Sequence, residues 1–147
     1  MTSAIIRQPA IALVDDDFHS ARLMLRMLAA HDAPLVDWLG GDPEKAFDSV
    51  LKLAALPLTA TRLMVLVDLK SSSTASRDFI ERLLHACPDL LVVAMAPSLD
   101  RDTRNQLLDA GAAAVFERHA ELNSYRGEAA NIVSYWVRAQ QLDAVGT

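Results

Sequence analysis

The amino-acid sequence predicts an α/β protein built on a doubly wound, five-stranded parallel sheet. Short apolar runs alternate five times with segments that carry apolar residues at helical spacing. Two of these runs end in carboxylates: residues 11–14 lead into three aspartates at 15–17, and residues 63–67 lead into Asp68. Continuous apolar runs are typical of strands that are buried on both faces, as in parallel sheets. Alternation of strand and helix with short loops favours a sheet covered by helices on both sides.

The alternating pattern places ten elements in order along the chain. Strands are expected over five apolar runs, at residues 10–14, 35–39, 63–67, 90–95 and 112–116. Helices are expected in the segments that follow them, at residues 18–30, 42–54, between 76 and 88, 100–110 and 128–142. Polar loops are expected at residues 57–61 and 71–76, and a long polar connection is expected at 117–126.

Apolar stripes and end signals justify the helices one by one. The stripes are Leu23, Met24, Met27 and Leu28, then Ala46, Phe47, Val50 and Leu51, then Phe79, Ile80, Leu83 and Leu84, and finally Ile132, Val133, Tyr135, Trp136 and Val137. Asp17 and Asp42 stand where N-cap residues belong, and Asp100 or Asp102 caps the fourth helix. Gly111 follows the end of that helix, where a left-handed residue commonly closes the last turn.

Length and composition predict one domain in a reducing compartment. The chain has 147 residues, of which 52% are apolar, enough for a single core. A formal net charge of −5 without a basic run argues against direct binding of nucleic acid. The only cysteine is Cys87, so no disulfide framework is expected. The first ten residues lack the apolar segment of a signal peptide, and no run is long enough to span a membrane. We therefore expect a cytoplasmic protein.

The aspartates are the candidate functional residues. If the first strand is central, the first and third strands lie side by side, and Asp15, Asp16 and Asp68 converge at one edge of the sheet. Clustered carboxylates repel one another unless something neutralises them, and a divalent cation with oxygen ligands is the natural candidate. The competing interpretation is a solvated acidic turn that caps the next helix.

Residues 9–141 resemble a response regulator receiver domain, the phosphoacceptor module of two-component signalling. The resemblance rests on three motifs in their expected order: Leu-Val-Asp-Asp-Asp at 13–17, Val-Leu-Val-Asp-Leu at 65–69 and Asp-Ala-Gly-Ala at 109–112. It implies a single receiver-like domain over residues 1–147. It also implies a flavodoxin-like (βα)5 fold with strand order 2-1-3-4-5.

The resemblance assigns roles to four residues. Asp15 and Asp16 match the acid pair that holds Mg²⁺, together with Asp68 and the backbone carbonyl of Lys70. Asp68 matches the aspartate that accepts a phosphoryl group from a histidine kinase or a histidine phosphotransfer protein. A carboxylate is a nucleophile that can form an acyl phosphate, and Mg²⁺ would offset its repulsion of the incoming phosphoryl oxygens. The resemblance thus implies a phosphoacceptor that acts through protein–protein interaction and is not a turnover enzyme.

Four departures from the family's pattern concern the response to phosphorylation. Met95 stands where the family has Thr or Ser, and a thioether cannot donate a hydrogen bond to a phosphoryl oxygen. Arg118 replaces the usual Lys and keeps the positive charge with a different shape. Val115 replaces the switch aromatic, and the loop 71–76 lacks the family's Met-Pro signature. We therefore expect a weak or differently connected conformational response.

Two other functions stay open. A pseudo-receiver would use the fold as a binding module that does not depend on phosphorylation, as Met95 and Val115 favour. A haloacid-dehalogenase-like phosphatase also places Asp-x-Asp after a first strand, which residues 15–17 contain, but it needs further acids after the fourth strand. In receivers, the face of the fifth strand, with the helices before and after it, is a common surface for homodimers and downstream partners. A core position is expected for Trp136, whereas an exposed Tyr135 or Val137 would favour an interface.

Overall fold

The computed structural model describes residues 9–56 and 62–146, with side chains up to residue 141. The strands are β1 (Ile11–Asp15), β2 (Val36–Trp38), β3 (Met64–Asp68), β4 (Leu91–Ala96) and β5 (Ala114–Glu117). The helices are α1 (Phe18–Ala29), α2 (Pro43–Ala54), α3 (Ala75–Ala86), α4 (Arg101–Ala110) and α5 (Leu122–Gly146). The loop expected at 57–61 lies outside the described residues, as do residues 1–8, on which the signal-peptide expectation mainly rests.

The predicted fold class and strand order are confirmed. The five strands form one parallel sheet in the order β2-β1-β3-β4-β5. In the register of β1 and β3, Asp15 lies opposite Asp68, so both strands present a carboxylate at the same edge. The two acidic motifs, more than fifty residues apart in the chain, therefore meet because of the parallel pairing.

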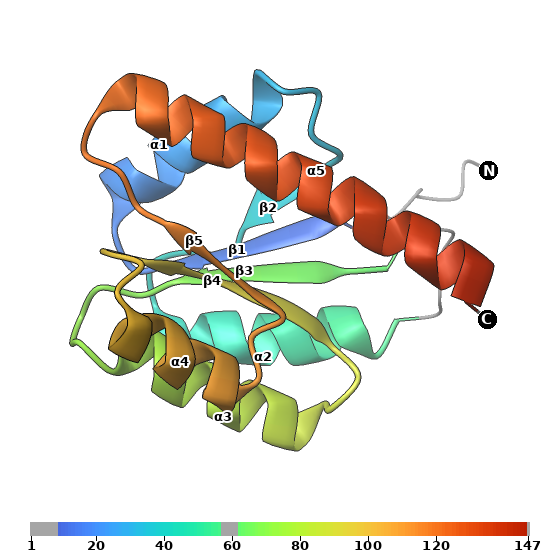
Figure 1. Cartoon of the computed structure of the whole chain (residues 1–147). Helices are drawn as coiled ribbons and strands as arrows, with labels where there is room; N and C mark the ends of the chain where they lie inside the picture. The colour runs from blue at the N-terminus through green and yellow to red at the C-terminus, as the bar shows by residue number, and fades with distance from the viewer. Residues whose placement is uncertain (1–8, 57–61, 147) are drawn as a thin grey trace, which may run out of the picture.

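Helices cover both faces of the sheet, with α1 and α5 on one side and α2, α3 and α4 on the other (Figure 1). Successive strand residues point to opposite faces, which explains why the strands are apolar throughout. In β3, Met64 and Leu66 join the core cluster under α1 and α5, whereas Val65 and Val67 join the cluster on the opposite face. All four side chains are fully buried.

The expected connection at 117–126 is wrong in its second half, because α5 begins at Leu122. The carboxylate of Glu121 accepts hydrogen bonds from the amides of Asn123 and Ser124 and from the Ser124 hydroxyl. These bonds satisfy donors that the first turn of a helix leaves free. The segment is polar and lacks an apolar stripe, so the periodicity of the sequence did not indicate a helix there. The early start places Tyr125 in the core.

The predicted caps of α1, α2 and α4 agree with the structure, whereas α3 begins at Ala75, inside the loop expected at 71–76. Asp17 and Asp42 accept hydrogen bonds from amides of the first turns of α1 and α2. Asp100, and not Asp102, caps α4, and Gly111 adopts the left-handed conformation with φ +116°. In the part of the chain that the structure describes, no helix combines the length and apolar character that crossing a bilayer requires.

The Asp100 cap is expected to make stability depend on pH in the acidic range. Hydrogen bonds from the Ser98 hydroxyl and from the amide and hydroxyl of Thr103 lower the pKa of Asp100 from 3.8 to about 2. A carboxyl with a lowered folded-state pKa stabilises the fold above its unfolded pKa, and that contribution is lost as the pH falls from about 4 to about 2. Denaturant unfolding of wild type and Asp100→Asn should show an advantage for wild type at neutral pH that shrinks over this range. An advantage that does not change with pH would contradict the role of the charge.

Candidate functional site

Two buried carboxylates lie at the carboxyl-terminal edge of the sheet. Asp15 is the last residue of β1 and Asp68 the last residue of β3, and their exposures are 1% and 0%. Two adjacent carboxylates that are removed from water destabilise a fold unless cations or hydrogen bonds compensate them. The groups that compensate the charge of these two carboxylates therefore determine the chemistry of the site.

The side chain of Lys70 provides the first compensating charge. Its Nζ lies 2.7 Å from Oδ1 of Asp15 and 3.0 Å from Oδ2 of Asp68. The first contact is a hydrogen bond. The second joins two opposite charges without hydrogen-bond geometry, because Oδ2 of Asp68 has no hydrogen-bond partner. From the sequence, only the backbone carbonyl of Lys70 was expected to contribute to the site, and the role of the ammonium was missed.

Arg118 provides the second compensating charge. Its Nε donates to Oδ1 of Asp68 at 3.0 Å, and an Nη2 donates to the same oxygen. The amide of Arg118 donates to the carbonyl of Ala96 at 2.7 Å, which continues the pairing of β4 with β5 and fixes the origin of the side chain. The guanidinium therefore lies where the resemblance predicted a positive charge, and Asp68 has one cation at each oxygen.

Asp16 makes a different set of contacts. Its Oδ1 accepts a hydrogen bond from the amide of Lys70 at 2.9 Å, and its Oδ2 accepts one from the amide of Ser71 at 3.0 Å. The Asp16 carboxylate thus joins the β1–α1 loop to the β3–α3 loop. Within the described residues, no group of three or more His, Cys, Asp or Glu side chains is arranged to hold a metal ion. The carboxylates of Asp15 and Asp68 share the Lys70 ammonium. Asp16 lies at the same edge of the sheet but does not form a three-carboxylate group with them.

Hydrogen bonds orient the end of β1. Oδ1 of Asp15 accepts from the amide of Asp17 at 2.9 Å, and the indole Nε1 of Trp38 donates to the carbonyl of Asp15 at 2.9 Å. Burial raises the pKa of Asp15, while the hydrogen bonds from Lys70 and Asp17 oppose that rise. Trp38 is the last residue of the three-residue strand β2 and belongs to no motif, so the sequence offered no reason to select it.

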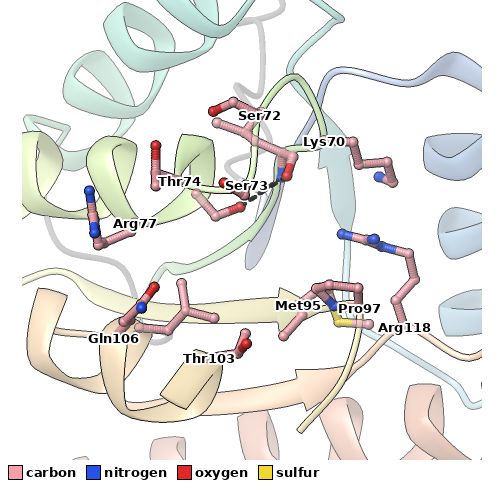
Figure 2. A pocket seen from close by; sticks show the side chains of 14 residues that line it. Lys70, Ser72, Ser73, Thr74, Arg77, Met95, Pro97, Thr103, Gln106 and Arg118 are labelled. Carbon is pink, nitrogen blue, oxygen red and sulfur yellow. Dashed lines mark hydrogen bonds between the residues drawn. The ribbon is translucent and has the colours of Figure 1, made fainter. Parts of the chain in front are cut away.

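Met95 lies buried beside a cavity next to these charges. Its exposure is 2%, and it lines a cavity of about 540 Å³ between the β3–α3 loop and the start of α4. Figure 2 shows the side chains of Lys70 and Arg118 at the same end of this cavity. At the position of the family's Thr or Ser, the protein therefore presents an apolar wall with no hydroxyl donor.

Tyr125 is a second residue that the sequence analysis missed. Its hydroxyl is buried and has no hydrogen-bond partner. Burial raises the pKa of Tyr125 well above its usual range, and the negative charges of Asp68 and Asp15 raise it further. Tyr125 belongs to the core cluster on the face of the sheet that α1 and α5 cover. It was missed because residues 117–126 were expected to form a surface connection.

The donor atoms at this edge suit a divalent cation. Oδ2 of Asp15 and Oδ2 of Asp68 are both buried and lack hydrogen-bond partners. The Lys70 ammonium lies between the two carboxylates and shows that their geometry accepts a cation. Hard carboxylate oxygens are the ligands that Mg²⁺ prefers, and it usually takes only one or two of them together with water.

The five-stranded topology and the acidic edge define a class: the chain has the fold of response regulator receiver domains. The cyanobacterial phytochrome response regulator RcpA, solved in its phosphorylated form, is similar with a TM-score of 0.68 and 19% identity, over 89% of this chain and 95% of that one. A receiver domain from Rhodospirillum rubrum gives a TM-score of 0.70 and 16% identity, over 86% and 92%. The Mn²⁺-bound form of response regulator Rcp1 gives 0.65 and 16%, over 87% and 94%. No protein-family model and no curated protein sequence matches the chain.

Proposed function

We propose that the protein is an atypical receiver of a two-component system or phosphorelay, in which Asp68 is a Mg²⁺-dependent phosphoacceptor. The observation that carries this proposal is the position of Asp68 at the end of β3, opposite Asp15 and bound to the guanidinium of Arg118. Phosphorylated and metal-bound forms are known for RcpA and Rcp1, two proteins with the same fold. With Cys87 as its only cysteine, the sequence has no disulfide framework, which supports a location in the reducing cytoplasm.

Each residue of the site would have a separate role in the transfer of a phosphoryl group to Asp68. An oxygen of Asp68 attacks the phosphorus atom of the donor, a new O–P bond forms, and the bond to the donor's nitrogen or oxygen breaks with its electron pair. Arg118 holds positive charge beside the nucleophile, where the phosphoryl oxygens arrive. Asp15, Asp68 and the Lys70 carbonyl would hold Mg²⁺, which neutralises charge on those oxygens. Asp16 keeps the loop that carries Lys70 in place. One phosphoryl group is accepted, and no turnover is expected.

The proposed partners are proteins. A histidine kinase or a histidine phosphotransfer protein would supply the phosphoryl group, and a downstream protein would bind the result. The surface formed by β5 and α5 is the proposed site for that partner or for a homodimer. Trp136 packs against the core, whereas Leu122 and Val137 of α5 are 53% and 41% exposed. Exposed apolar side chains of this kind favour an interface.

A second function, the pseudo-receiver, is favoured by one observation. The buried Met95 offers no hydroxyl that could bind a phosphoryl group. The phosphoryl group therefore lacks one contact by which it could favour an active conformation of the protein over an inactive one. The fold would then serve as a binding module whose partner does not sense phosphorylation. The phosphatase alternative finds no support, because β4 ends at Ala96 and Pro97 follows, where that enzyme needs acids.

The phosphoacceptor role predicts a specific gain in mass. Incubation with Mg²⁺ and acetyl phosphate should add one phosphoryl group to the wild-type protein and none to Asp68→Asn, because Asp68 is the only carboxylate bound to Arg118 in the described residues. Asp109→Asn, on the exposed face of α4, is the matched control and should gain the group like wild type. Intact-mass spectrometry with and without EDTA provides the measurement. Absence of the gain in wild type would favour the pseudo-receiver, and a gain in Asp68→Asn would show that another residue accepts the group.

A further inference from the structure

The Lys70 ammonium occupies the place between the carboxylates of Asp15 and Asp68. At 2.7 Å from Asp15 and 3.0 Å from Asp68, the ammonium stands where a cation that contacts both carboxylates would bind. Both carboxylates are almost completely buried, while the Lys70 side chain is 22% exposed. The cation in this site is therefore the end of a flexible side chain that reaches in from the surface.

The backbone of Lys70 is fixed independently of its side chain. Asp16 accepts the amide of Lys70, and the Ser76 hydroxyl accepts the amide of the preceding residue, Leu69, at 2.9 Å. The side chain can therefore leave the carboxylates while the β3–α3 loop keeps its position. The cavity of about 540 Å³ that Lys70 lines offers space for the displaced chain (Figure 2).

We propose that Lys70 is the resident cation of this site and that a divalent cation binds only by displacing its ammonium. Lys70 then sets the metal affinity of the protein: it keeps the two carboxylates compensated when metal is scarce and weakens metal binding by competition. This inference rests on the metal site of the proposed function and adds the residue that regulates it. A single ammonium compensates only one of the two negative charges, whereas a divalent ion compensates both. At sufficient concentration, the divalent ion therefore displaces the ammonium from the two carboxylates.

Metal titrations of charge-matched variants test the proposal. Lys70→Met removes the ammonium and keeps the length of the side chain, and Lys70→Gln is a second variant without the charge. Lys45→Met removes an equal charge from the exposed start of α2 and is the control. Dissociation constants for Mg²⁺ and Mn²⁺ come from isothermal titration calorimetry. In a Trp136→Phe background, the fluorescence of Trp38 reports on the Asp15 end of the site through its hydrogen bond.

The expected result is metal binding at least about tenfold tighter in both Lys70 variants, because the ion no longer competes with charge-assisted hydrogen bonds. Lys45→Met should bind metal like wild type. Without metal, the Lys70 variants should melt at a lower temperature than wild type, and Mg²⁺ should raise their Tm more than it raises that of wild type. Equal or weaker metal binding in the Lys70 variants would overturn the proposal, as would an absence of binding in all proteins.

The result can be separated from a failure of the proposed function. If Lys70→Met binds metal more tightly while wild-type Asp68 never gains a phosphoryl group, the competition by Lys70 stands and the phosphoacceptor role fails. If Asp68 gains the group in the presence of Mg²⁺ while the Lys70 variants bind metal as wild type does, the phosphoacceptor role stands and the competition by Lys70 fails.

Discussion

Replacement of Arg118 by methionine is expected to lower the free energy of unfolding by about 3 kcal/mol, because it leaves a buried carboxylate with one cation fewer. Asp68 is fully buried, and the Arg118 guanidinium supplies both hydrogen bonds to its Oδ1. The side chain of Arg118 is 24% exposed, and Lys70 remains at the other oxygen, so the expected loss lies at the low end for a broken buried pair. Urea denaturation at neutral pH measures it.

The Asp68→Asn background provides the control for this prediction. A neutral amide does not need a counter-charge, so Arg118→Met in that background should cost less than about 1 kcal/mol. Arg118→Lys should keep most of the wild-type stability, because it retains a positive charge at the end of β5. Equal losses in both backgrounds would show that Arg118 stabilises the fold through packing and not through Asp68.

Gly111→Ala is expected to destabilise the fold by about 2 kcal/mol, the cost of a left-handed conformation for a residue with a side chain. Gly111 closes α4 with φ +116°, and an added methyl group would overlap with Cδ1 of Leu84 in α3. Leu84 can move the end of its side chain, so most of the expected loss comes from the backbone. Thermal or urea unfolding of the variant measures the effect.

Gly127→Ala is the matched control with the opposite sign. Gly127 lies inside α5, and its added methyl group would meet no atom within 4 Å. Alanine is favoured over glycine in a helix by roughly 1 kcal/mol, so this variant should be as stable as wild type or more stable. If both alanine variants lost stability to the same extent, the left-handed turn would not be the reason for glycine at 111.

The elements that could be predicted from the sequence are those governed by local patterns. Continuous apolar strands, aspartate caps and the glycine after α4 have causes within a few residues of themselves, and the parallel order followed from the alternation of strand and helix. The start of α5 was missed because its first turn is held by Glu121 and carries no apolar stripe. Local polarity gave no sign that Tyr125 is buried.

The contacts of the site could be predicted only in part. The positions of Asp15, Asp68 and Arg118 follow from where their strands end, so motif order was sufficient to bring them together. The path of the Lys70 side chain was not predictable in this way, because a long flexible chain can point to solvent or back into the protein. Only the three-dimensional balance of charge around two buried carboxylates shows why it turns inward.

The pair of hydrogen bonds from Asp16 to the amides of Lys70 and Ser71 has a mechanical consequence. Two loops that are more than fifty residues apart in the chain are joined to each other at the carboxyl-terminal edge of the sheet. They cannot shift separately without breaking these bonds. A displacement of the start of α1 is therefore expected to move the loop that carries Lys70 as well.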